Sequence, residues 1–201
     1  RAEFVQQWHL CQITNYEEVQ GDVEVALRGA DVMIGFSKPG PGVIKPEWIK
    51  QMAPNAIVIA GANPIPEIWP WEAREAGAAV VATGRSDFPN QVNNSLGFPG
   101  IFRGALDIRA RTITDEMAIV ASEALAGMVG ADELSPEHIL PTMDDWDIFP
   151  REAAAVAMKA QEQGVARLTT TYEEEHARAL AMIRAAREMT QLLMREAFIP
   201  A

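Results

Sequence analysis

The chain has 201 residues, 48% of them hydrophobic, which suits one globular domain or one domain with an appendage. Its formal net charge of -11 argues against partners such as nucleic acid or anionic membrane surfaces, because both require a positive protein face. Cys11 is the single cysteine, so the chain can form neither an internal disulfide nor a thiolate metal cluster, and a reducing cytoplasm suits it.

The first half of the chain alternates short apolar runs with short helical segments. Helices are predicted over four ranges: 1–10, 22–28, 46–52 and 71–76. Strands are predicted over three ranges, as continuous apolar runs typical of strands buried on both faces: 30–36, 56–60 and 79–82. Strands that alternate with helices over short links indicate right-handed crossovers and a parallel sheet, but three strands are only half of a doubly wound domain.

The second half is predicted to be helical. Helices are expected over four ranges: 98–109, 114–126, 151–163 and 172–197. The fold class is therefore α/β, an incomplete doubly wound (Rossmann-like) parallel sheet with a helical carboxyl-terminal extension. We place a partial dinucleotide-binding domain at 1–127 and the extension, packed on it, at 128–201. The last helix carries an apolar stripe that packs either on its own domain or on another domain or subunit.

Neither a membrane span nor a signal peptide is predicted. No apolar run approaches 18 residues, so no membrane span is predicted. Residues 1–10 lack the apolar core of a signal peptide and an initiator methionine. We interpret this start as that of a fragment or a processed product.

Carboxamide side chains follow two of the predicted strands. Asn63 comes after the second strand, and Asn93 and Asn94 lie in a long loop after the third. A carboxamide both donates and accepts hydrogen bonds, so it can hold a carboxylate and a hydroxyl together. Ligands of open α/β sheets bind at this edge, but asparagines also serve turns, and both interpretations stay open.

Other polar groups offer weaker candidates. The Pro39–Gly42 turn cannot cradle a phosphate as a glycine-rich loop does, since proline removes backbone donors; it is either a rigid turn or a loop beside a cofactor. The three histidines are isolated in sequence, and we interpret them as surface or packing residues. The acids between Asp144 and Asp147 are interpreted as solvated loop charges. No metal-ligand spacing is present, so we predict no metal site made by this chain alone.

Four strings carry a resemblance to a known family. They are 30–37 (ADVMIGFS), 62–68 (ANPIPEI), 82–94 (ATGRSDFPNQVNN) and 98–107 (FPGIFRGALD). Together they resemble the NAD-binding half of the bacterial malic enzymes, and 149–151 and 164–167 resemble later landmarks of the same family. The likeness covers roughly residues 20–168, and the 82–94 string is its most specific part.

The resemblance implies oxidation of malate and decarboxylation to pyruvate with NAD or NADP and Mg²⁺ or Mn²⁺. It implies that Asn63, Asn93 and Asn94 bind the substrate, so that they orient C2–H toward the nicotinamide. It also implies that Gly35, Ser37 and Asn63 lie at the cofactor. The family's catalytic tyrosine and lysine, its metal carboxylates and its glycine-rich turn have no counterpart here, so we assign no catalytic residue and no metal ligand to this chain.

Two hypotheses follow from what the sequence lacks. In the first, the chain is the carboxyl-terminal portion of a malic enzyme, inactive alone, which works with the missing amino-terminal part in a cytoplasmic homo-oligomer. In the second, it is a non-catalytic binding or assembly module that retains a Rossmann-like remnant. We prefer the first. A three-strand remnant also exposes a sheet edge, which predicts low stability or association of the isolated chain.

Overall fold

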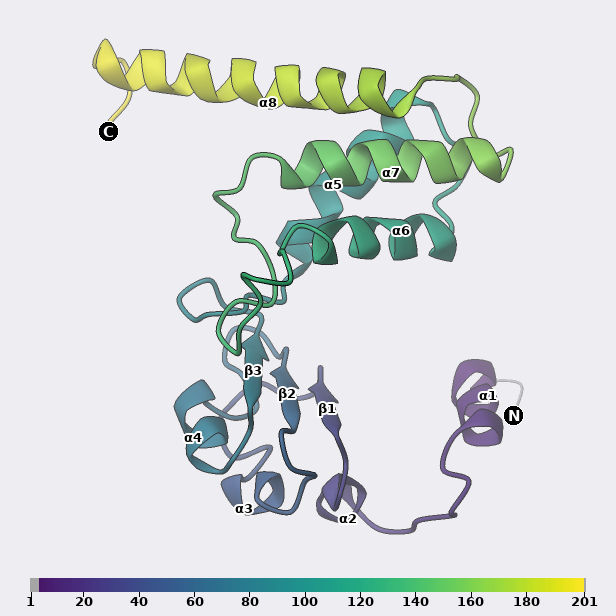
Figure 1. Ribbon diagram of the computed structural model, residues 1–201, viewed down its shortest axis with the longest axis vertical. Helices are drawn as coiled ribbons and strands as arrows, with labels where there is room; N and C mark the ends of the chain where they lie inside the picture. Colours follow the sequence, from purple (N-terminus) through teal and green to yellow (C-terminus); the bar gives the residue numbers. More distant parts are fainter. Residues whose placement is uncertain (1–3, 201) are drawn as a thin grey trace. The chain divides into compact units, whose positions relative to one another are not determined.

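The computed structural model describes residues 4–200 and divides into two compact units, Arg1–Val81 and Ala82–Ala201 (Figure 1). Residues 1–3 of the predicted first helix lie outside the described residues. The domain boundary predicted at residue 127 falls inside the second unit, and it stays a prediction.

The first unit contains the parallel sheet. Its elements are α1 (Val5–Ile13), α2 (Val23–Leu27), β1 (Val32–Gly35), α3 (Pro46–Ile49), β2 (Ile57–Ala60), α4 (Pro70–Glu75) and the start of β3 (Val80–Thr83). The strands follow the order β1-β2-β3, and β1 pairs in parallel with β2, with Val32 opposite Ile57 and Gly35 opposite Ala60. The predicted α/β class with an incomplete parallel sheet is confirmed.

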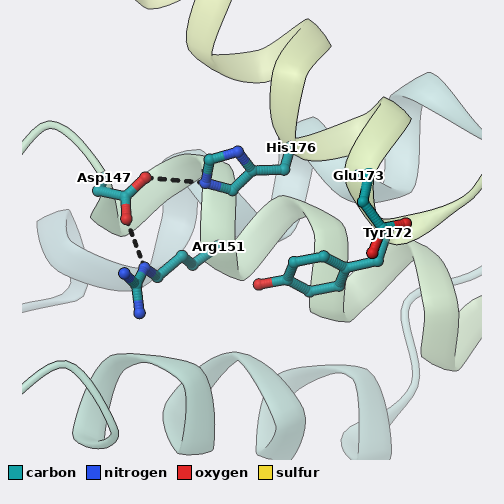
Figure 2. A pocket seen from close by; sticks show the side chains of 5 residues that line it. All are labelled: Asp147, Arg151, Tyr172, Glu173 and His176. Carbon is teal, nitrogen blue, oxygen red and sulfur yellow. Dashed lines mark hydrogen bonds and ion pairs between the residues drawn. The ribbon is translucent and has the colours of Figure 1, made fainter.

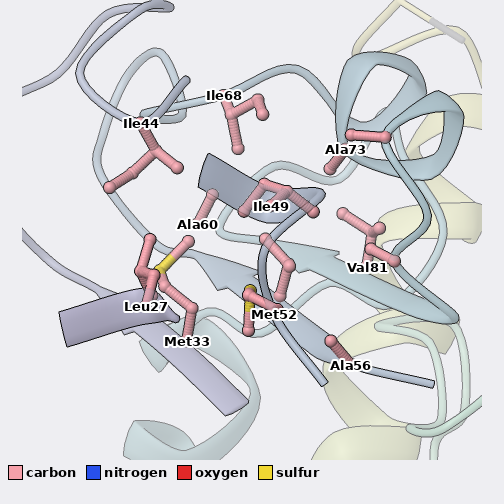
Figure 3. Close-up of a cluster of buried hydrophobic side chains, with 13 residues drawn as sticks. Leu27, Met33, Ile44, Ile49, Met52, Ala56, Ala60, Ile68, Ala73 and Val81 are labelled. Carbon is pink, nitrogen blue, oxygen red and sulfur yellow. The ribbon is translucent and has the colours of Figure 1, made fainter. Parts of the chain in front are cut away.

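Local signals explain where the short helices start. Asp22 accepts a hydrogen bond from the Val25 amide and caps α2, and Pro46 takes the first position of α3. One hydrophobic core then joins these helices to the sheet (Figure 3). Val58 of β2 lies in this core and is fully buried. The helices are too short to be stable alone, so this shared core stabilises them.

Burial along β1 differs from the prediction. Met33 is buried, but Val32 and Ile34 on the opposite face are 46% and 61% exposed. The prediction that this strand is buried on both faces is therefore wrong. β1 is one of the two edge strands, and the residues 4–200 leave the face that carries Val32 and Ile34 largely uncovered.

The second unit is a helical assembly of α5 (Asn94–Asp107), α6 (Asp115–Ala126), α7 (Ile148–Glu162) and α8 (Tyr172–Arg195). Figure 1 shows α7 beside α5, α6 and α8, and all three pack on it. Its buried face is rich in small residues, among them Ala153, Ala157 and Ala160. Among the residues that the structure describes, no helix has the length and apolar character needed to cross a bilayer.

Two helices start earlier than predicted. α5 begins at Asn94 rather than residue 98, because the Asn93 side chain accepts a hydrogen bond from the Ser95 amide and caps the helix. α7 begins at Ile148 rather than residue 151, because Pro150 falls in the first helical turn, where no amide partner is needed. Asn93 and Asn94 therefore belong to a helix start and not to the interior of a loop.

Candidate functional site

In the first unit, the candidate site residues lie where β1 and β2 end. The ladder continues one step past the strands, since the Gly61 amide donates to the Gly35 carbonyl at 2.8 Å. Ser37 and Asn63 follow these glycines and are both exposed. No hydrogen bond of the Asn63 carboxamide is found within residues 4–200. An exposed hydroxyl and an exposed carboxamide thus lie at adjacent strand ends, where a ligand can reach them.

A buried acid ties these two strand ends together. Glu67 is fully buried, and its Oε1 accepts hydrogen bonds from the Ser37 amide at 2.9 Å and the Ser37 hydroxyl at 3.3 Å. Its Oε2 accepts from the Ala62 amide at 3.1 Å. The residues before and after Asn63 are therefore anchored through one carboxylate.

In the second unit, several polar side chains of the loop 84–93 are bonded to other groups of the same unit. Arg85 makes an ion pair with Asp87 at 2.7 Å. Asn90 is buried, donates to the Pro136 carbonyl at 2.8 Å and accepts from the Ile139 amide at 3.0 Å. Contacts within the second unit therefore account for these polar groups, which made the segment look like a ligand-binding loop.

The sequence left open whether Asn93 and Asn94 bind a ligand or serve local structure, and the two residues differ in this respect. The Asn93 carboxamide donates to the Gly84 carbonyl at 2.6 Å and accepts from the Ser95 amide at 2.9 Å, so it holds the turn and caps α5. Asn94, at the first position of α5, is exposed, and its side chain has no bonded partner in the described part of the chain. Asn94 is thus the better ligand-binding candidate of the two.

The predicted convergence of the three asparagines involves residues of both units. Asn63 belongs to the first unit, and Asn93 and Asn94 belong to the second. Within each unit the free carboxamide follows a strand of the sheet, as expected. The shared rim of Asn63 and Asn94 stays a prediction.

A second polar cluster lies between α7 and α8 (Figure 2). It lines a cavity of about 460 Å³ with Asp147, Arg151, Tyr172, Glu173 and His176. The Asp147 carboxylate accepts a hydrogen bond from Arg151 and lies 2.8 Å from His176 Nε2. Partial burial opposes the ionisation of Asp147, but the bonds to Arg151 and His176 outweigh it and hold the pKa of Asp147 below its usual range. Because one carboxylate contacts both side chains, the cluster is a hydrogen-bonded network that connects α8 to α7. The interpretation of His176 as a surface or packing residue stays a prediction.

Two further acids are buried among the helices of the second unit. Burial raises the pKa of Glu152 on α7 to about 8, and neither of its oxygens has a hydrogen-bond partner among the described residues. Burial, with a hydrogen bond and repulsion from Asp107, raises the pKa of Glu175 on α8 to about 7. Arg178 donates to Glu175 at 3.0 Å, and Arg103 pairs with Asp107. Both acids lie at contacts between helices of the second unit.

Metal ligands are not gathered at any point of the described chain. Within residues 4–200, no group of three or more His, Cys, Asp or Glu side chains is arranged to hold a metal ion. Two of the acids between Asp144 and Asp147 already have protein partners: Asp145 accepts from the Thr142 amide at 3.0 Å, and Asp147 belongs to the network between α7 and α8.

Sequence reasoning missed Glu67 and the two buried acids of the helices. Glu67 stands inside the 62–68 string, four residues after Asn63, and an acid in an otherwise apolar and proline-rich stretch was the available signal. Glu152 had a similar signal, because an alanine-rich helix face leaves no room for a solvated charge.

Comparisons with known proteins agree on one family. The family described as "Malic enzyme, NAD binding domain" matches residues 3–163. The chain is 50% identical over 176 residues to the "Bifunctional malic/malolactic enzyme" of Bacillus subtilis, and 49% identical over 157 residues to an NAD-dependent malic enzyme of Geobacillus stearothermophilus. These matches cover 87% and 78% of this chain, but 42% and 32% of those proteins.

Solved structures give the same result. The chain is similar to the malic enzyme of Entamoeba histolytica with a TM-score of 0.94 and 53% identity, over 98% of this chain and 40% of that one. It is also similar to the malic enzyme of Pyrococcus horikoshii, with a TM-score of 0.84 and 50% identity, over 91% and 42% of the two chains. The chain spans about two fifths of the length of these relatives.

Proposed function

The chain belongs to the malic enzyme family, and we propose that it is one part of an enzyme that oxidises malate and releases pyruvate and CO₂. The observation that carries the proposal is 50% identity over 176 residues to a relative named as a malic/malolactic enzyme. Because the chain spans 42% of that relative, the activity belongs to the longer polypeptide.

Asn63 and Asn94 are the residues of this chain that we assign to the substrate. Both side chains are exposed and have no bonded partner among the described residues. Each carboxamide can donate to a carboxylate of malate and accept from its C2 hydroxyl, which holds C2–H toward the nicotinamide. Asn93 caps the same helix, and we assign it to the substrate site as the residue that holds Asn94 in place.

Ser37 and Asn63 also fit a dinucleotide. They lie at the carboxyl ends of adjacent parallel strands, where such cofactors bind, and Gly35 precedes them. Their hydroxyl and carboxamide match the ribose hydroxyls and the carboxamide of a nicotinamide nucleotide. The chemistry that NAD⁺ or NADP⁺ supplies is acceptance of the hydride, and that of Mg²⁺ or Mn²⁺ is polarisation of the C2 carbonyl. The donor set that would hold the metal is assigned to the part of the enzyme outside this chain.

The proposal also covers which nicotinamide cofactor the enzyme uses, how it assembles and where it is located. Relatives include an NAD-dependent enzyme at 49% identity and an NADP-dependent enzyme of Halomonas elongata at 45%, so both cofactors belong in the assay. We further propose a homo-oligomer in the cytoplasm, in keeping with the family resemblance and the single cysteine.

The test is turnover by the full-length polypeptide that contains this chain. Malate, NAD⁺ or NADP⁺ and Mn²⁺ should yield pyruvate. Asn94→Ala should lower kcat/KM about 100-fold, because a misplaced substrate loses its alignment with the nicotinamide. The matched control is Gln12→Ala, which removes an exposed carboxamide from α1 and should leave the kinetics unchanged.

Two results would count against the proposal in different ways. Unchanged kinetics in Asn94→Ala would remove this residue from the substrate site. Wild-type protein that binds NADH or NADPH without turning over malate would favour the alternative, a non-catalytic binding or assembly module.

A further inference from the structure

The Glu67 carboxylate lies at the centre of a set of hydrogen bonds that joins the loops after β1 and β2. Besides the three hydrogen bonds to the Glu67 side chain, the backbone carbonyl of Glu67 accepts from the Ile44 amide at 3.2 Å. The backbone carbonyl of Ile65 accepts from the Gly40 amide at 3.2 Å. The loop that carries Ser37 and the loop that carries Asn63 are thus connected at several points. Side-chain and backbone contacts act on the same pair of segments.

The surroundings of Glu67 are unusual for a buried acid. It is fully buried, and in the described part of the chain no cation pairs with it. Its partners are two amides and one hydroxyl, all neutral. A buried acid without hydrogen bonds would cost several kcal/mol, so these three donors are what permits it to sit there. An apolar side chain of similar volume would fill the core at lower cost, which points to a role beyond packing.

Gly35 is shaped to this carboxylate. A Cβ at Gly35 would lie 2.9 Å from Glu67 Oε1, closer than real Cβ contacts. The absence of a side chain there leaves the room through which Glu67 reaches the Ser37 amide. The role of Gly35 at the site is therefore, at least in part, to admit Glu67.

The bond to Glu67 also fixes the polarity of the Ser37 hydroxyl. In this bond the Ser37 hydroxyl donates its single proton to Glu67 Oε1. What Ser37 offers to a ligand is then limited to its oxygen lone pairs. Such a group can accept from an amide N–H or a ribose O–H, and it repels a phosphate oxygen.

We propose that Glu67 is a positioning residue for the dinucleotide and substrate groups, which it holds by orienting the Ser37 hydroxyl as an acceptor and by anchoring the backbone next to Asn63. This inference rests on the proposed function. It assigns to Ser37 a ligand atom that carries a proton, on the nicotinamide carboxamide or the adjacent ribose.

The experiment compares Glu67→Gln, Ser37→Ala and the double variant in the full-length polypeptide. Glu67→Gln keeps the shape but places an NH₂ group against one of the donors, which frees the Ser37 hydroxyl to turn. NADH or NADPH fluorescence titration should give a Kd raised about 10-fold in each single variant. The double variant should be no weaker than the worse single one, because both changes remove the same contact.

Matched readouts separate positioning from stability. Glu75→Gln, the same change at an exposed position of α4, should bind the dinucleotide like the wild type. Hydrogen exchange without ligand should show faster exchange of the Ser37 and Ala62 amides in Glu67→Gln only. A purely structural Glu67 would reduce the amount of folded protein and leave the Kd of the folded fraction unchanged.

Each result bears on the inference or on the function, and the two are distinguishable. Folded Glu67→Gln with wild-type Kd and amide exchange overturns the inference. If Glu67→Gln fails to fold, Ser37→Ala decides: an unchanged Kd overturns the inference, and a raised one supports it. Wild-type protein with normal dinucleotide binding and no malate turnover overturns the proposed reaction alone.

Discussion

At the scale of single residues, the second unit holds a carboxyl group in surroundings that oppose its charge. Glu152 is 1% exposed, faces Gly97 and Gly100 of α5, and has two oxygens without partners among the described residues. Burial raises its pKa to about 8, so at neutral pH the side chain is mainly protonated and acts as a neutral polar group. Ionisation would leave an unpaired charge inside the α5–α7 contact.

This raised pKa predicts how stability depends on pH. The unfolded side chain titrates near 4.5 and the folded one near 8. Below pH 4.5 the folded and the unfolded state both hold the proton, and the stabilisation is complete. As the pH rises from 4.5 to 8, the unfolded chain releases its proton while the folded chain keeps it, so the free energy of unfolding falls. At about 1.4 kcal/mol per pKa unit, the loss is on the order of 5 kcal/mol.

Glu152→Gln should therefore be more stable than the wild type at alkaline pH and should show a weaker decline of stability with pH. Urea unfolding at several pH values across this range measures the difference, with the exposed Glu188→Gln as control. Glu175, whose pKa is raised to about 7, adds a loss of the same sign in both proteins, so the comparison isolates Glu152. Parallel curves for Glu152→Gln and wild type would contradict the prediction.

Prediction from sequence named candidate site residues but could not give each of them its place in the local structure. The carboxamides of Asn93 and Asn94 are chemically identical and adjacent, so spacing cannot tell which one caps a helix. The answer depends on whether α5 starts at residue 94 or 98, and only tertiary packing decides that. Glu67 was missed for a related reason, because its donors come from residues up to 30 positions away in sequence.

At the scale of elements, close approach of α5 to α7 organises the second unit. Gly104 has no room for a side chain: a Cβ there would lie 2.3 Å from the Ala153 carbonyl oxygen and 2.9 Å from the Cβ of Val156. Gly97 lies two helical turns earlier and has room for a side chain. The nearest atom to a Cβ there would be Cδ1 of Ile101, 3.8 Å away. Close packing of α5 on α7 therefore requires glycine at residue 104 but not at residue 97.

The two glycines predict opposite effects of the same substitution. Gly104→Ala should destabilise the fold by about 1–3 kcal/mol, because backbone of α7 must move. Gly97→Ala should stabilise it by about 0.5–1 kcal/mol, because alanine favours the helix interior. Thermal melting by circular dichroism tests both, and shifts in the same direction would show that the α5–α7 contact is not as tight as described.

The order of helices and strands followed well from sequence, and the ends did not. Apolar runs between turn residues placed all three strands. The predicted start of α7, directly after Pro150, was too late because the first turn of a helix tolerates proline. The predicted start of α5 was too late because it missed the cap at Asn93. Burial of β1 could not be predicted, since it depends on what lies beyond the sheet edge.

At the scale of the whole molecule, the exposed face of β1 and the length of the relatives have one explanation. Val32, Ile34 and Phe36 are 46%, 61% and 71% exposed. Three large apolar side chains in alternate positions at a sheet edge are typical of a surface that is covered in the complete protein. The relatives are more than twice as long as this chain, which leaves ample polypeptide to cover it.

This explanation predicts that one substitution has opposite consequences in two contexts. In the isolated 201-residue chain, Ile34→Lys should reduce self-association, because a lysine at an open edge discourages pairing with a second chain. In the full-length polypeptide the same change should lower stability by about 2 kcal/mol or more, because it buries a charge. Sedimentation velocity and thermal melting measure the two effects, with the exposed Ile119→Lys of α6 as control in both. An isolated chain that is monomeric and melts cooperatively at high temperature would contradict the account, since it would show that the edge needs no cover.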